Sequence, residues 1–322
     1  MTEPQPGLLA AAQPEAFDRL LRGAIDVHVH GQPDLTAGAP NRGADLDVAR
    51  LAREYGISGW VLKSHVWATM DRARSLQQAL AGTFTVYGSI TLNPPVGGLE
   101  PAVVELAAAH GARVVFLPSW GTAADAARGG YIATLLKRVS PSFGEYHART
   151  AIALCDAAGN LSGQARAVID ACRALDLALC TGHASLEESR AVAEYCAEIG
   201  QRLLINHPLH YTKDLAALSE LAGTGAYLEF AGAPLVHPEA HLSLRDVHEA
   251  LCALGPERAI LTTDVFSRWV PPEPECFRMF VEQLAYLGWS AEQIATMVST
   301  NPRAFLAAPS SPAGDPHPEG SA

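Results

Sequence analysis

Eight short apolar runs alternate with eight amphipathic segments along most of this 322-residue chain, and that alternation constrains the fold more than any other feature. Short apolar runs bounded by turn residues are typical of buried strands, and strands that alternate with helices indicate βα units and a parallel sheet. The predicted strands span 24–30, 57–63, 84–92, 112–117, 177–182, 202–206, 225–230 and 259–263. The predicted helices span 45–55, 69–81, 99–110, 164–175, 185–199, 212–222, 243–254 and 275–287.

Eight such units predict the α/β class and a (β/α)8 barrel of the TIM type, in a single domain with a long insertion after strand four. The alternative is an open doubly wound sheet, which more often carries a glycine-rich phosphate turn after its first strand; "HVHGQPD" is not such a turn. We expect the barrel to span residues 15–307, between a flexible N-terminus at 1–14 and a tail at 308–322 whose Pro, Gly and Ser content predicts disorder.

The insertion, residues 118–162, separates the fourth strand from its helix. Loops of this length in compact domains are usually functional. Its segment "AIALCDAAGNLS" predicts two short strands around a turn. The insertion is therefore expected to form a lid or a wall of the site; the alternative is a peripheral hairpin that serves stability or dimerisation.

Charge and composition exclude several partners. With 34 acidic against 23 basic residues and a net charge of −11, the chain is unsuited to nucleic acid or to an anionic membrane surface. Its six cysteines form no CxxC pair, which is typical of a reducing compartment. The N-terminus lacks the basic region of a signal peptide, and no apolar run approaches the ~20 residues of a membrane span. These features predict a cytoplasmic protein with a small-molecule substrate, and they leave a homo-oligomer open.

The first predicted strand ends in "DVHVH", and strand side chains alternate between two faces. Alternation predicts that Asp26, His28 and His30 share one face, opposite a purely aliphatic one. Two imidazoles two residues apart on one strand face can share a metal ion.

Other strands carry polar residues at the same end. Barrel active sites lie at the C-terminal ends of the strands, so these side chains should meet around one cavity. A lone histidine there is more often hydrogen-bonded structure, and an aspartate after a strand is often a helix N-cap, but the whole set favours a metal site. Imidazole and carboxylate ligands suit zinc, with Mn, Fe, Ni or Co as alternatives. The residues in this set are His28, His30, Lys63, His65, His183, His207 and Asp264.

The motifs "DVHVH", "TGH", "NHP", "TTD" and "TNPRAFL", between residues 24 and 306, resemble those of the amidohydrolase superfamily of metal-dependent hydrolases. More narrowly, "HVHGQPD", "VLKSH", "LNPPVGG", "TGHASLEES" and "TTDVF" resemble an uncharacterised branch of that superfamily. The resemblance implies a distorted (β/α)8 barrel, one or two divalent metals, and attack of a metal-bound hydroxide on an amide, ester or related bond.

By this resemblance, individual residues take expected roles. His28 and His30 match the pair that holds the more buried metal, and His183 and His207 match the usual ligands of a second metal. Asp264 matches the aspartate that binds the buried metal and carries the proton from the attacking water to the leaving group.

The chain departs from the family pattern at strand four, where "VVFLPSW" offers no lysine or glutamate to bridge two metals. The remaining candidate is Lys63 on strand two, which would be a bridging carbamate, a free ammonium that binds a substrate carboxylate, or a buried neutral amine with a depressed pKa. His65, on the same face, would be a further ligand or a substrate contact. Asp264, Lys63 and His65 form the predicted catalytic set.

Three functions follow from these expectations. The first is a hydrolase of an amide, cyclic amide or lactone, and the second is a mononuclear zinc decarboxylase or lyase, which needs no bridging lysine. The third is a catalytically silent barrel used as a binding protein. Phosphoesterase chemistry is also possible, but the sequence has no obvious basic clamp for a phosphate.

In the first loop, Asp34 and Arg42 are expected simply to pair with each other. Substrate contacts are expected from the loops after the strands: Asn93, Trp120, Tyr146, His147, His210, Tyr211 and Glu229.

Overall fold

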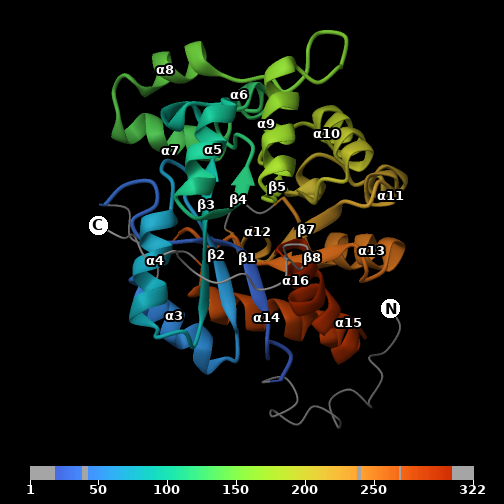
Figure 1. The fold of residues 1–322 in the computed structure, drawn as a ribbon. Coiled ribbons are helices and arrows are strands. Elements are labelled where there is room, and N and C mark those ends of the chain that lie inside the picture. The colour runs from blue at the N-terminus through green and yellow to red at the C-terminus, as the bar shows by residue number, and fades with distance from the viewer. Residues whose placement is uncertain (1–18, 38–42, 238–240, 268–269, 307–322) are drawn as a thin grey trace, which may run out of the picture.

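The computed structural model describes residues 19–37, 43–237, 241–267 and 270–306. The expectations for residues 1–14, 308–322 and Arg42 lie outside these ranges. Eight parallel strands follow one another in sequence order around a barrel, with helices on the outside (Figure 1). The strands are β1 (Ile25–His30), β2 (Gly59–Lys63), β3 (Thr85–Thr91), β4 (Ala112–Phe116), β5 (Ala178–Cys180), β6 (Leu203–Ile205), β7 (Tyr227–Ala231) and β8 (Ala259–Thr262).

The helices between successive strands, and the one after β8, occupy the predicted positions. Ser185, for example, forms a capping box with Glu188 at the start of one of them. These helices are α3 (Asp45–Glu54), α4 (Met70–Ala79), α5 (Pro101–Ala109), α9 (Gly163–Ala174), α10 (Leu186–Ile199), α11 (Leu215–Gly223), α13 (Leu244–Leu254) and α14 (Glu273–Tyr286). Further helices are α12 (Ala233–Val236), α15 (Ala291–Ala295) and α16 (Asn301–Leu306). The (β/α)8 barrel is therefore confirmed, and no helix in the described ranges has both the length and the apolar content to cross a bilayer.

A bulge in β1 changes which of its side chains face the barrel interior. Asp26 pairs with Trp60 but Val29 pairs with Leu62, so β1 has one more residue than β2 in this stretch. Such a bulge shifts the alternation of faces by one. The interior of the barrel consequently receives Ile25 and Val27 from before the bulge and the two histidines from after it.

The face expected for Asp26 is therefore corrected. Its carboxylate does not lie beside His28 and His30 but accepts hydrogen bonds from the backbone N–H and the hydroxyl of Thr263, at 3.1 and 2.5 Å. Its other oxygen accepts the backbone N–H of His28 at 3.0 Å. Asp26 thus links β1 to the end of β8, where the barrel closes.

The interior of the barrel divides into an apolar end and a polar end. Phe305 of α16 packs beneath the strands at the N-terminal end, against side chains that include Val27 and Phe116. The polar side chains lie at the opposite, C-terminal end. This division excludes water from one end of the barrel and gathers the charged groups at the other.

The insertion forms three helices, α6 (Ala123–Ala127), α7 (Tyr131–Val139) and α8 (Phe143–Thr150), grouped at one end of the barrel (Figure 1). The two strands expected in its second half are reduced to isolated bridges, because Cys155 pairs only with Leu161 there and Ile152 pairs with Thr122 instead. The helices are held by an apolar cluster of Trp120, Ile132, Ala133, Leu136 and Phe143.

Candidate active site

Four of the predicted metal ligands converge at the C-terminal end of the barrel. The Nε2 atoms of His28 and His30 lie 3.0 and 3.1 Å from Oδ1 of Asp264. Nε2 of His207 lies 3.7 Å from the other oxygen of Asp264. Ligand atoms of His28, His207 and Asp264 all lie within 4.8 Å of one another, and all three residues are buried. Two imidazoles and a carboxylate at this spacing are a donor set that fits a divalent transition metal.

Two of these residues have an unusual backbone. His207 and Asp264 have φ angles of 48° and 52°, in the left-handed region that non-glycine residues rarely adopt. Asp264 is held there by a hydrogen bond of 3.0 Å from its N–H to the carbonyl of His28. Residues held in such strained conformations cluster at functional sites. The backbone conformation and the side-chain geometry therefore both indicate that His207 and Asp264 are functional residues.

Glu229 supports the ring of His28. Its Oε1 lies 2.6 Å from Nδ1 of His28, and it also accepts hydrogen bonds from Asn206 Nδ2 and Thr262 Oγ1, at 2.8 and 2.9 Å. Although burial raises the pKa of Glu229, the charges of His28 and His207 lower it below its ordinary value. An ionised Glu229 accepts a hydrogen bond from Nδ1–H of His28, so that Nε2 is the ring nitrogen directed at the candidate metal site. In the structure Glu229 therefore positions His28, and the substrate contact expected of it stays a prediction.

Asp34 plays the same part for His30 and His65. Its Oδ2 lies 2.5 Å from Nδ1 of His65 and 3.2 Å from Nδ1 of His30, and its Oδ1 accepts the backbone N–H of His65 at 2.8 Å. Burial lowers the pKa of His65 to about 3 against the opposing pull of Asp34, so its ring is neutral. With the Nδ1 proton donated to Asp34, Nε2 of His65 carries a lone pair. These bonds involve both carboxylate oxygens of Asp34, and its expected pairing with Arg42 stays a prediction, because Arg42 lies outside the described residues.

His183 lies on the wall of the site, outside the tightest group of ligand atoms. Its Nδ1 is 2.9 Å from Oδ1 of Asp125, and its ring centroid is 5.7 Å from that of His207. The preceding Gly182 has a φ of +61°, and a Cβ there would lie 2.3 Å from the carbonyl oxygen of Leu117. Only glycine fits this turn, which sets the direction of His183.

Lys63 lies behind the histidines. Its Nζ is 2.8 Å from Nε2 of His28 and 5.0 Å from the centroid of the Phe116 ring. Only 1% of Lys63 is exposed, and burial lowers the pKa of its amine. Phe116 belongs to β4, so an aromatic ring packs into the barrel from the strand that carries the bridging lysine in the family pattern.

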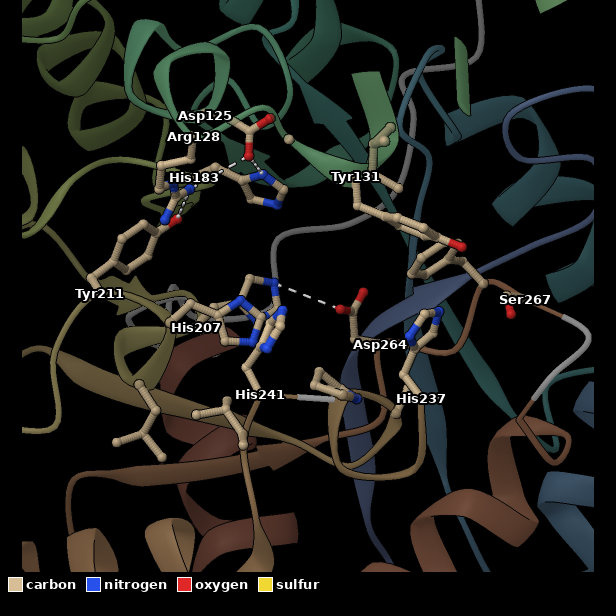
Figure 2. A pocket seen from close by; sticks show the side chains of 18 of the residues that line it. Asp125, Arg128, Tyr131, His183, His207, Tyr211, His237, His241, Asp264 and Ser267 are labelled. Carbon is tan, nitrogen blue, oxygen red and sulfur yellow. Dashed lines mark hydrogen bonds and ion pairs between the residues drawn. The ribbon is translucent and has the colours of Figure 1, made fainter. Parts of the chain in front are cut away.

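A cavity of about 810 Å³ opens above these ligands, within the range of small-molecule sites (Figure 2). Six of the predicted site residues line it: His65, His183, His207, His210, Tyr211 and Asp264. Other lining residues were not foreseen, and among them are Asp125, Arg128, Tyr131, His237 and Phe266. Three of these come from the insertion, so the expectation that it forms a wall of the site agrees with the structure.

The remaining predicted substrate contacts do not line this cavity. Asn93 and Trp120 both donate side-chain hydrogen bonds to the carbonyl of His65, at 2.8 and 2.7 Å. Nε2 of His147 lies 2.7 Å from the carbonyl of Trp120, and Tyr146 packs against the apolar cluster of the insertion. The side chains of Asn93, Trp120 and His147 therefore hold the backbone of the loops after β2 and β4, and substrate contact by these four residues stays a prediction.

Solved structures share this fold at low sequence identity. A Pseudomonas putida protein assigned as a 2-pyrone-4,6-dicarboxylic acid hydrolase is 20% identical, with a TM-score of 0.57 over 88% of this chain and 97% of its own. An amidohydrolase from Pseudomonas aeruginosa is 12% identical, with a TM-score of 0.58 over 92% of this chain and 98% of its own. An organophosphorus hydrolase from Deinococcus radiodurans is 13% identical, with a TM-score of 0.55 over 90% of this chain and 94% of its own. These likenesses show that the chain shares its barrel fold with these structures.

A family model described as a family of unknown function, DUF6282, matches residues 23–229. No curated protein matches the chain.

Proposed function

This chain belongs to DUF6282, a family of unknown function, and from its site we propose that it is a metal-dependent hydrolase of an amide, cyclic amide or lactone bond in a small molecule. The observation that supports this best is the meeting of His28, His30, His207 and Asp264 beneath a cavity of about 810 Å³. The structural neighbours include proteins titled as hydrolases, which agrees with this class of reaction.

His28, His30 and Asp264 would hold one metal ion, and His207 with His183 would hold a second. A bound zinc ion supplies Lewis acidity and lowers the pKa of a bound water to near 7. Around it, Asp264 accepts a proton from the attacking water and returns it to the departing nitrogen or oxygen. Asp264 suits this task because it lines the cavity while His28 and His30 hold its Oδ1.

The hydrogen bond between His65 and Asp34 limits the roles that His65 can take in the reaction. A neutral ring that donates Nδ1–H to Asp34 has no proton on Nε2, so it cannot donate a hydrogen bond to a developing oxyanion. We propose that His65 acts as a metal ligand or accepts a hydrogen bond from the substrate. Its place on the cavity lining agrees with either role.

We further propose that Lys63 is carboxylated when two metals bind. Its amine would add CO2 and lose a proton, and the resulting carbamate oxygens would lie among the ligands, because Nζ is already 2.8 Å from His28 Nε2. A free amine directed at the substrate suits the structure less well, since Lys63 does not line the cavity.

The mononuclear lyase remains a second candidate, because β4 directs Phe116 into the barrel and offers no bridging lysine. Two metal ions per chain would favour the hydrolase, and one would leave both reactions open.

The test is hydrolysis of a panel of lactones, cyclic amides and dipeptides by purified chain of measured metal content. Asp264→Asn should lower kcat at least about 10²- to 10⁴-fold while the chain stays folded, because a positioned acid–base group contributes that much. Asp47→Asn is the matched control, since the Asp47 side chain is 74% exposed on α3. Absence of hydrolysis across the panel by metal-loaded protein, or near-native turnover by Asp264→Asn, would refute the proposal.

A further inference from the structure

One wall of the cavity carries a cation whose donors are only partly used. Arg128 follows α6 in the insertion, and its guanidinium is partly exposed to the cavity. One of its terminal nitrogens lies 3.4 Å from Oδ1 of Asp125, an oxygen that His183 already shares at 2.9 Å. Within the part of the chain that the structure describes, the remaining N–H groups of Arg128 donate no hydrogen bond to the protein.

Tyr211 holds this guanidinium in place. The ring of Tyr211 stacks beneath it, with 4.3 Å between Arg128 Cζ and the ring centroid. The same terminal nitrogen of Arg128 donates to the Tyr211 hydroxyl at 3.3 Å. A hydroxyl that accepts this bond keeps its own proton to donate elsewhere. Figure 2 shows Arg128, Tyr211 and His183 together on one side of the cavity.

Two permanent cations among the lining residues can offer hydrogen-bond donors to an anion. Among its described lining residues, the permanent cations are Arg128 and Lys213, and the acids are Asp125 and Asp264. Lys213 is neutralised by Asp246, whose carboxylate lies 2.7 Å from its Nζ. Asp264 belongs to the metal ligands. Both cations are therefore paired with an aspartate, but only Arg128 presents a planar guanidinium, whose shape matches the two oxygens of a carboxylate.

We propose that the substrate carries a carboxylate, which Arg128 and Tyr211 bind on the wall of the cavity while the scissile bond lies at the metal ligands. This proposal rests on the proposed function for the reaction but concerns a separate group of residues. Two N–H donors of Arg128 and the hydroxyl of Tyr211 would meet the carboxylate oxygens. Arg128 would thus select anionic substrates over neutral ones of the same shape.

The test measures binding and needs no substrate. Benzoate and its neutral isostere benzamide are titrated by calorimetry into the metal-loaded full chain. Arg128→Gln should weaken benzoate binding about 10- to 100-fold, the usual effect of losing hydrogen bonds to a charged group, and should leave benzamide binding unchanged. Lys213→Gln, which removes one positive charge from the same lining, should change benzoate affinity less than about threefold. Inorganic phosphate should bind more weakly than benzoate.

A second variant distinguishes the loss of a hydrogen bond from a disturbance of the cavity wall. Tyr211→Phe keeps Arg128 and the ring stacking, and should weaken benzoate binding by several-fold, about the effect of one hydrogen bond. Circular dichroism, melting temperature and metal content are compared for all variants. Benzoate affinity that Arg128→Gln leaves near the native value, or an equal loss for benzoate and benzamide, overturns the carboxylate site.

The two proposals fail separately. If Arg128→Gln hydrolyses carboxylate-bearing and neutral lactones as fast as the native chain, the carboxylate site is refuted and the hydrolase stands. If benzoate binding depends on Arg128 but no member of the panel is hydrolysed, the carboxylate site is supported and the hydrolase is refuted.

Discussion

At the scale of single residues, buried carboxylates decide the chemistry of the imidazoles. Glu229 and Asp34 each accept a hydrogen bond from Nδ1–H of a histidine, which turns the Nε2 atoms of His28 and His65 away from these carboxylates. Partners of this kind orient metal ligands and raise their basicity. The histidines of this site are therefore set up as ligands by residues that never touch the cavity.

Replacing Glu229 by Gln should test this support. The amide keeps the shape of the side chain but removes the charge that holds His28, so metal affinity should fall about 10- to 100-fold. Competition with a chelator of known affinity measures the change. Glu220→Gln is the control, because the Glu220 side chain is 66% exposed and forms a surface ion pair with Arg190. Native metal affinity in Glu229→Gln would show that the carboxylate serves packing alone.

At the scale of elements, short turns after the strands aim the ligands. The turn between β5 and α10 depends on Gly182, whose N–H donates to Asn206 Oδ1 at 2.9 Å. Asn206 in turn donates to Glu229. The loops after β5 and β6 are thereby joined to strand β7 through two polar side chains, and His183 is held relative to His28.

Gly182→Ala should break this connection. The new Cβ would lie within 2.4 Å of two carbonyl oxygens on a backbone with a φ of +61°, so the turn must move. We expect a loss of about 2–5 kcal/mol in the free energy of unfolding, the sum of backbone strain and overpacking. Urea denaturation measures it. At Gly144 on α8 a Cβ meets nothing within 4 Å, so Gly144→Ala should be neutral or slightly stabilising. Equal stability of the two variants would contradict the assigned role of the turn.

At the scale of the whole molecule, the ligands connect distant parts of the barrel. His28 and Glu229 lie 201 residues apart in the sequence, and Asp26 reaches Thr263 across 237 residues. A metal held by His28 and His30 of β1 and by Asp264 after β8 would join the first and last thirds of the chain. Its binding should therefore add to the stability of the entire fold.

Removal of the metal should lower the melting temperature of the full chain. A ligand present at about 100 times its Kd stabilises by about 2.7 kcal/mol, which for a domain of this size corresponds to roughly 4–5 °C. Scanning calorimetry before and after treatment with a chelator measures the change, and added zinc should reverse it. Asp264→Asn, which weakens the site, should respond less to the chelator. An unchanged melting temperature in the native chain would contradict a structural contribution from the metal.

Much of this protein could be predicted from local patterns. Strands and helices follow from periodicity and capping, which depend on neighbours in the sequence, and the order of the barrel follows from their alternation. The position of His28, His207 and Asp264 at strand ends then places them around one cavity, because all parallel strands end on the same side of a barrel.

The tertiary structure alone decided which way side chains face and what they bind. The bulge that separates Asp26 from His28 depends on pairing with β2. Which insertion residues line the cavity depends on how α6 and α7 pack, and so Arg128 lies there while Trp120 binds the carbonyl of His65. A buried polar group must find a partner wherever the fold brings one, and that partner is commonly remote in sequence. The sequence by itself determined the kind of site, and only the packed barrel determined its supporting residues.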